Sequence, residues 1–200
     1  MSQTIRDFYH LHNDDTSVVV ACRRHQPAVS YFGDRLNRVN VAQLSQLDRH
    51  EAPASLSIEP SISLTPTIGD GFLGRVGLEI HRGPAAWSLA PTLAQADASQ
   101  LNLTLISRCS ISDVEVTHQL KLDPDQSVLC LSVSIGNLSD ETVLFIDNCA
   151  MTLPLRDHLS AFEEVTGRWA YEFQTERRSI SRAAYVRENW TGRSSHHMNP

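Results

Sequence analysis

The sequence predicts an all-β fold in which antiparallel strands form a sandwich or a barrel. Three observations support this prediction: apolar and polar residues alternate with a period of two, turn residues separate the alternating stretches, and helical spacing is weak. The chain has 200 residues, of which 41% are hydrophobic and 20% charged, so it can bury a sizeable core. We expect one domain, residues 1–200, with at most one or two short helices.

The one stretch with helical spacing lies in the first quarter of the chain. Val41–Leu47 places apolar residues on one helical face, but it is only about two turns long. Prolines follow it and favour loop and short edge strands between residues 36 and 71. These prolines are Pro53, Pro60 and Pro66.

The clearest strands are expected in the middle of the chain. In Val114–Leu122 one face is apolar apart from His118 and the other face is polar, which is typical of a strand packed on a core. Asp123-Pro124-Asp125 then predicts a turn, because proline presets φ and aspartate side chains bond the local backbone. Alternating or β-branched runs predict the other strands at 76–81, 101–106, 129–135, 142–147 and 168–174.

Charge and composition exclude several classes of partner. The net charge is −6 and basic residues do not cluster, which argues against nucleic acid or an anionic membrane as the main partner. The longest apolar runs are far shorter than the ~18 residues of a membrane helix, and residues 1–16 do not resemble a secretory signal peptide. The cysteines lie in apolar stretches, so we expect buried free thiols and a cytoplasmic location. They are Cys22, Cys109, Cys130 and Cys149.

Metal-binding and nucleophilic motifs are incomplete. Cys22 and His25 have ligand-like spacing, and His10 and His12 are expected on one face of a strand, but a second paired motif is missing. We therefore expect neither a metal nor another cofactor. Ser195 and His196 are adjacent, and adjacent residues of an extended segment point to opposite faces, which disfavours a catalytic triad.

Acidic and aromatic residues give no catalytic pattern either. Each close pair of acids is predicted to be solvated or to form a turn; the pairs are Asp113 and Glu115, Asp123 and Asp125, and Glu163 and Glu164. Trp169 shares a strand face with Tyr171 and Phe173, which predicts core packing. Trp87 and Trp190 are the candidates for an exposed aromatic platform.

The most specific motifs lie in the C-terminal third. Gly167-x-Trp169-x-x-Glu172 is followed by Arg177-Arg178 and then by Gly192-Arg193-x-Ser195-His196-x-x-Asn199-Pro200. Earlier segments are Tyr31-Phe32-Gly33-x-Arg35-Leu36, Gly71-Phe72-x-Gly74-x-x-Gly77-Leu78-Glu79, and Leu122-x-Pro124-Asp125 through Asn137. In this order and spacing they resemble the N-terminal domain of glycoside hydrolase family 36 α-galactosidases, over about residues 9–200.

The resemblance implies a fold and a parent activity. It implies an antiparallel β-supersandwich of two large stacked sheets. A following (β/α)₈ barrel would carry the catalytic aspartate pair and hydrolyse terminal α-galactosides of the melibiose and raffinose type without a metal. Because this barrel is absent from the chain, the chain alone is expected to be inactive.

The resemblance also implies partners and contact residues. The barrel domain of the same parent chain and further copies in a homo-oligomer are the expected partners, and galactoside substrate is reached through the parent. The loop corresponding to Asn37–Thr67 lends a side chain to a neighbouring sugar pocket in the family, and here Asp48 and Glu51 are its central acids. The family-motif and interface candidates are Trp169, Glu172, Arg177, Arg178, Arg193, Ser195, His196 and Asn199.

Three functions remain open at this point. The first is a non-catalytic domain that supports a catalytic barrel, oligomer assembly and one wall of the sugar pocket. The second is a self-standing carbohydrate-binding module, which requires an exposed aromatic platform. The third, by fold analogy alone, is a sugar-processing enzyme of the mutarotase kind that uses His and Glu.

Overall fold

A computed structural model describes residues 5–23, 26–37, 43, 62–72, 74–84, 88–153, 159–168, 170–181 and 185–187. The chain forms two compact units, Met1–Pro154 and Leu155–Pro200, each of which is described by itself. The short helix predicted at Val41–Leu47 lies outside the described residues apart from Gln43. Within the described ranges, no helix is both long enough and apolar enough to span a membrane.

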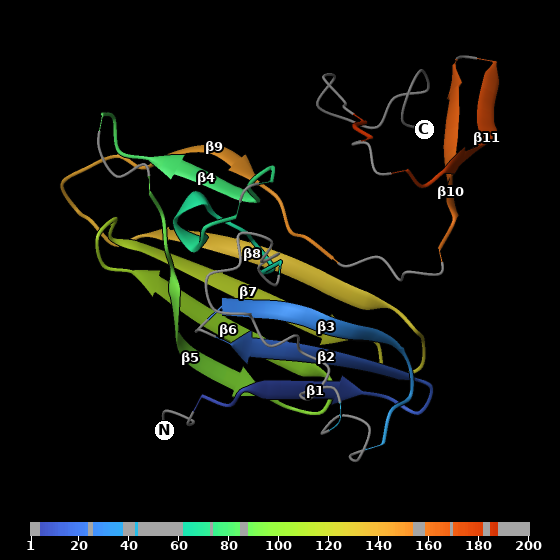
Figure 1. Cartoon of the computed structure of the whole chain (residues 1–200), viewed down its shortest axis with the longest axis horizontal. Coiled ribbons are helices and arrows are strands. Elements are labelled where there is room, and N and C mark those ends of the chain that lie inside the picture. Colours follow the sequence, from blue (N-terminus) through green and yellow to red (C-terminus); the bar gives the residue numbers. More distant parts are fainter. Residues whose placement is uncertain are drawn as a thin grey trace, which may run out of the picture. The chain divides into compact units, whose positions relative to one another are not determined.

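The first unit is built from antiparallel strands (Figure 1). One sheet has the order β1-β2-β3, a second has the order β5-β6-β7-β8, and β4 pairs with β9. The strands are β1 (Phe8–His12), β2 (Thr16–Arg23), β3 (Gln26–Asp34), β4 (Leu78–His81), β5 (Thr92–Ala98), β6 (Asn102–Cys109), β7 (Val114–Leu122), β8 (Leu129–Asn137) and β9 (Phe145–Cys149). The predicted all-β antiparallel fold is confirmed.

The main core lies between the sheet β1–β3 and the sheet β5–β8, which Figure 1 shows stacked one over the other. On β7 every second residue from Val114 to Leu122 is buried, as the alternation predicts. On β8 the inward residues are only half-buried, because β8 forms an edge of its sheet. Each fully buried leucine contributes about 1.5–3 kcal/mol. The buried leucines of this core are Leu11, Leu64, Leu93, Leu103, Leu105, Leu120 and Leu122.

A second core lies under the β4–β9 pair. Leu78 and Ile80 of β4 pack against Val114 and Val116 of β7. Residues 62–67 run between the small sheets and join them through the backbone: the Leu64 N–H donates to Pro27 O at 2.8 Å. The β1–β3 sheet and the β4–β9 pair together form one layer of the sandwich, and the β5–β8 sheet forms the other.

Gly77 allows the backbone segments around Pro66 and Ala150 to approach each other closely. The Gly77 N–H donates to Pro66 O at 2.7 Å, and the Ala150 N–H donates to Gly77 O at 2.6 Å. A Cβ at Gly77 would lie 2.5 Å from Ala150 O, which is closer than real contacts allow. A glycine is therefore required here, because a side chain would collide with the neighbouring backbone.

Asn13 links two distant turns. Its Nδ2 donates to Asp123 O and to Gln126 O, both at 2.9 Å, and its Oδ1 accepts from the backbone N–H of Asp15 at 3.0 Å and of Thr16 at 2.7 Å. Asn13 is buried, so all of these groups depend on one side chain for their hydrogen bonds. The turn after β1 is thereby held against the turn after β7.

The turn after β7 has the chemistry that its sequence predicts. Asp123 Oδ1 accepts from the backbone N–H of Asp125 and of Gln126, both at 2.9 Å. Thr16 Oγ1 and Ser127 Oγ are 2.5 Å apart and add a second bond between the two turns.

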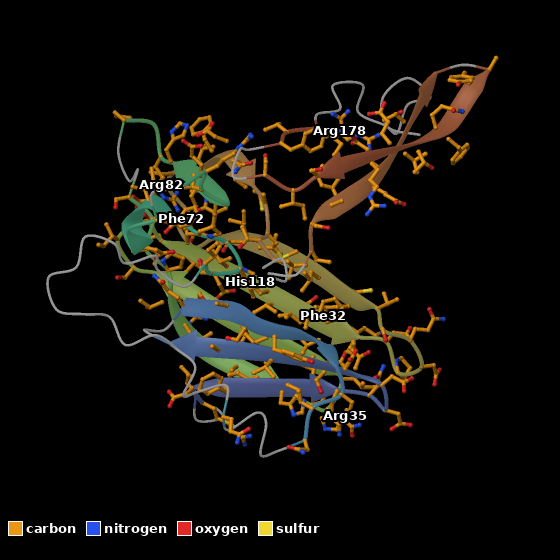
Figure 2. The ribbon with its side chains drawn as sticks, turned by 45° about the vertical axis from the view of Figure 1, so that its right-hand side comes forward. Phe32, Arg35, Phe72, Arg82, His118 and Arg178 are labelled. Carbon is orange, nitrogen blue, oxygen red and sulfur yellow. The ribbon has the colours of Figure 1, made fainter. Side chains whose placement is uncertain are left out.

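Arg82 performs a similar task at the other end of the sheet, and Figure 2 shows it beside β4. Its guanidinium donates to Ser112 O at 2.8 Å, to Asp113 O at 3.0 Å and to Thr142 O at 2.9 Å. One planar cation with several N–H donors therefore binds the turn after β6 and the link between β8 and β9.

Two of the four cysteines depart from the prediction. Cys22 and Cys109 are buried free thiols as predicted, and burial raises the pKa of Cys22 to about 12. Cys130 and Cys149 are exposed, so the prediction of burial is wrong for them. Cys130 occupies an outward position of β8 and Cys149 ends the exposed strand β9, where an apolar sequence context does not imply burial.

The second unit contains a hairpin of β10 (Ala161–Arg168) and β11 (Tyr171–Ser179). Its register shifts between Thr166 and Arg168, and Ala170 and Phe173 have positive φ. These irregularities interrupt the alternation, so Tyr171 and Phe173 are 59% and 74% exposed and do not form the predicted core face. Trp169, assigned to the same face, lies outside the described residues.

Replacing Asn13 by alanine is expected to destabilise the first unit. Two carbonyls and two N–H groups lose their partner, so we expect the free energy of unfolding in urea to fall by about 2–3 kcal/mol. Asn102→Ala is the matched control, because Asn102 is exposed, and its effect should stay within about 0.5 kcal/mol. Equal effects of the two substitutions would show that the Asn13 link is not stabilising.

Stability is also expected to depend on pH through His118 of β7. Burial lowers its pKa from 6.5 to about 4, so between these values the unfolded chain binds a proton that the folded chain does not. Above pH 6.5 this histidine does not reduce the free energy of unfolding. As the pH falls from 6.5 to about 4, protonation of the unfolded chain lowers that free energy by about 3 kcal/mol in total. In His118→Gln, urea titrations should show a correspondingly smaller loss over this interval. Parallel pH profiles of the variant and the parent chain would contradict this expectation.

Candidate functional site

The structure places only a few of the predicted site residues. Arg177 and Arg178 lie on β11 with described side chains, and Glu172 lies on β11 in the described backbone. The other predicted residues lie outside the described residues: Asp48, Glu51, Trp169, Arg193, Ser195, His196 and Asn199. Their predicted roles stay predictions.

The most developed polar cluster surrounds Glu164 on β10. Tyr185 OH lies 2.7 Å from Glu164 Oε1 and 2.6 Å from Oε2, and Arg178 Nε donates to Oε1. Arg187 Nη1 adds a longer contact to Oε2 at 3.4 Å. We call Glu164, Arg178, Tyr185 and Arg187 the Glu164 cluster; Figure 2 labels its Arg178 on the hairpin.

Aromatic packing and backbone contacts complete the Glu164 cluster. The Tyr185 ring lies 5.1 Å from the Phe162 ring between centroids, and the Arg178 guanidinium lies 5.1 Å from the Tyr185 centroid. Arg187 Nη2 donates to Val165 O at 2.7 Å. The cluster thus binds β10, β11 and residues 185–187 to one another.

The electrostatics keep Glu164 ionised. The hydrogen bond from Tyr185 lowers the pKa of Glu164 most, and Arg178 lowers it further. The same contacts raise the pKa of Arg178 and of Tyr185. A carboxylate that is held anionic by several donors is a poor general acid, so this geometry favours binding and positioning over proton transfer.

Glu164 is predicted from its sequence to be solvated or to form a turn, and this prediction is wrong. Glu163 is exposed, but Glu164 is 8% exposed. Glu164 lies opposite Glu176 in the hairpin register, and Arg178, two residues further along β11, contacts both acids. The hairpin brings Arg178 to Glu164, and the return of the chain at residues 185–187 brings Arg187; neither contact is visible in the sequence alone.

The other predicted acid pairs also have structural roles. Glu115 forms an ion pair with Arg108 at 2.8 Å, and Asp123 caps its turn. Asp113 is a turn residue with positive φ. Within the described ranges, these acids therefore do not present the pair of facing carboxyls that glycosidase chemistry requires.

His10 and His12 lie on one face of β1, as predicted, with ring centroids 4.9 Å apart. His10 Nε2 lies 2.9 Å from Ser17 Oγ, and burial followed by the His12 and Arg35 charges lowers the pKa of His10 to about 4. His25, from the same metal hypothesis, lies outside the described residues. Among the described residues, no group of three or more His, Cys, Asp or Glu is placed to hold a metal ion.

An exposed aromatic surface on β9 was missed by the sequence analysis. Phe145 is 50% exposed, and its ring stacks on His81 with centroids 5.1 Å apart. His81 Nε2 lies 3.3 Å from Asp147 Oδ2. Neighbouring apolar side chains are also exposed, namely Leu138, Val143 and Ile146. A β-branched run next to a turn resembles any core strand in sequence, so only the edge position of β9 reveals this surface.

The family model "Glycosyl hydrolase family 36 N-terminal domain" matches residues 25–200. An alpha-galactosidase from Escherichia coli is 25% identical over 196 residues, which are 98% of this chain and 27% of that protein. The chain therefore spans about a quarter of this relative's length.

Solved structures show the same fold. The family 36 alpha-galactosidase AgaA from Geobacillus stearothermophilus superposes with a TM-score of 0.79 at 18% identity, over 96% of this chain and 31% of that chain. The alpha-galactosidase from Lactobacillus brevis gives a TM-score of 0.80 at 18% identity, over 96% of this chain and 30% of that chain. With the family-model match over most of its length, the chain belongs to the glycosyl hydrolase family 36 N-terminal domains.

Proposed function

We propose that this chain is the non-catalytic N-terminal domain of an α-galactosidase that hydrolyses terminal α-galactosides. The observation that carries the proposal is the unequal coverage: the match spans 98% of this chain but only 27% of the alpha-galactosidase relative. Several acids of the described residues form a turn or ion pairs, among them Glu115, Asp123 and Glu164, which agrees with chemistry housed in another part of the parent protein. We also propose that both units belong to one domain; the extent of the family-model match, residues 25–200, supports this.

The physical task of the domain is to support a catalytic domain of the same parent chain. The exposed apolar side chains of Phe145 and Ile146 on β9 support this role, because a partner domain could cover them. We further propose that Arg177 and the predicted loop acids Asp48 and Glu51 contribute to oligomer contacts and to one wall of the sugar pocket. Arg178 acts differently, because the Glu164 cluster uses its guanidinium internally.

A second candidate function is a carbohydrate-binding module. The observation that favours it is Phe145, whose exposed ring stacks on His81, and the His81 imidazole in turn contacts Asp147. Sugars stack on aromatic rings while polar groups bind their hydroxyls. We favour the first function, because the match covers 98% of this chain but only 27% of the alpha-galactosidase relative, as expected for one part of a larger enzyme.

The decisive experiment compares this chain with a parent chain that carries the catalytic domain. We expect this chain alone to release no galactose from an aryl α-galactoside, and the parent to do so, because the proposal places the catalytic acids in another part of the parent protein. Release by this chain that disappears on replacing one Asp or Glu would contradict the proposal. Saturable binding of galactose to this chain, lost in Phe145→Ala but not in Tyr171→Ala, would favour the binding module instead.

The Glu164 cluster is expected to hold the hairpin in a single conformation. In Glu164→Gln the ionic contacts to Arg178 and Arg187 weaken, so amide hydrogen exchange in β10 and β11 should become faster. Glu163→Gln is a matched control, because the neighbouring acid is exposed. Exchange rates that change equally in the two variants would show that the cluster does not stabilise the hairpin.

A further inference from the structure

The inward face of β6 and β7 contains two polar side chains, and these two are neighbours. Ser107 pairs with Val116, and His118 pairs with Leu105, so Ser107 and His118 are diagonal neighbours on this face. Such neighbours lie about 7–8 Å apart along the backbone, which leaves room for a small group between their side chains. The other inward residues of the two strands are apolar: Leu103, Leu105, Cys109, Val114, Val116, Leu120 and Leu122.

Both polar side chains are deeply buried and incompletely bonded. Ser107 is 2% exposed and His118 is 3% exposed. Among the described residues, neither Ser107 Oγ nor His118 Nδ1 has a protein hydrogen-bond partner. Leaving a buried polar group unbonded is costly, and most buried polar atoms in proteins bind either protein or ordered water.

A small cavity adjoins both side chains. Its volume is about 10 Å³, close to the space that the centre of one water molecule requires. The rest of its lining is mixed: Gln26, Ser63, Thr65 and Asp70 contribute polar groups, whereas Pro27, Leu64 and Pro91 are apolar. The two unbonded atoms of Ser107 and His118 are therefore not enclosed by apolar side chains alone, and a water molecule finds polar partners there.

The hydrogen bonds of the His118 imidazole define whether a group in the cavity must donate or accept. His118 Nε2 lies 3.1 Å from Thr65 Oγ1. If Thr65 donates to Nε2, then Nδ1 carries a proton and needs an acceptor; if Nε2 donates, Nδ1 needs a donor. Because burial lowers the pKa of His118 to about 4, the ring is neutral and a charged occupant is not required. A water molecule suits either tautomer, since it both donates and accepts.

We propose that one ordered water molecule occupies this cavity and bridges Ser107 Oγ and His118 Nδ1. The water completes a chain from Thr65 through the imidazole to Ser107 and is part of the folded structure. It explains why two polar residues stand in an otherwise apolar layer of the sandwich.

The test is a high-resolution crystal structure of this chain. We expect a water peak within about 2.7–3.2 Å of both Ser107 Oγ and His118 Nδ1. A cavity without density, or a side-chain rearrangement that bonds the two residues directly, would overturn the proposal.

A second measurement in solution does not depend on crystals. In Ser107→Ala the water loses one of its two partners, so the ¹⁵N chemical shift of His118 Nδ1 should change. Ser112→Ala is the matched control, because Ser112 is also buried but does not line the cavity. An unchanged His118 signal in Ser107→Ala, or equal changes in both variants, would contradict the proposed bridge. Both alanine variants remove only a hydroxyl, so the fold should persist.

Discussion

Burial of alternate side chains between two sheets is the constraint on which the rest of this structure depends. A strand with period-two patterning has one apolar face, and that face is removed from water only when another layer covers it. Here the β5–β8 sheet is covered by β1–β3 along one part and by the β4–β9 pair along the other. Asn13, Gly77 and Arg82 stand where these layers meet, and each satisfies backbone groups that the packing would otherwise leave unbonded.

The parts that the sequence predicted well are those governed by local alternation. β7 followed its pattern at every position from Val114 to Leu122, and the turn at Asp123 formed with its expected backbone bonds. The parts that it predicted poorly depend on a strand's place in the sheet. Cys130 and Phe145 lie in apolar stretches, yet both are exposed: Cys130 is on the outward face of β8, as the alternation of that strand implies, and Phe145 is on β9, whose exposure depends on its place in the sheet.

The candidate site shows the same division between local and long-range information. Sequence motifs identified the family, which no single strand pattern could do, and Arg178 was singled out through them. Its actual partner, Glu164, was not, because that contact needs the register of the β10–β11 hairpin and the return of the chain at Tyr185. The adjacent acids Glu163 and Glu164 proved to differ, one exposed and one buried, since adjacent strand residues face opposite sides.

The link made by Asn13 has a consequence for the order in which the protein is assembled. Its acceptors at Asp123 and Gln126 lie 110 and 113 residues further along the chain. During synthesis the N-terminal strands therefore emerge long before the turn that completes them, and they cannot reach their final bonding until β7 has left the ribosome. The early β1–β3 sheet must wait with one apolar face uncovered, which makes this interval the stage at which a nascent chain is most open to chaperones and to self-association.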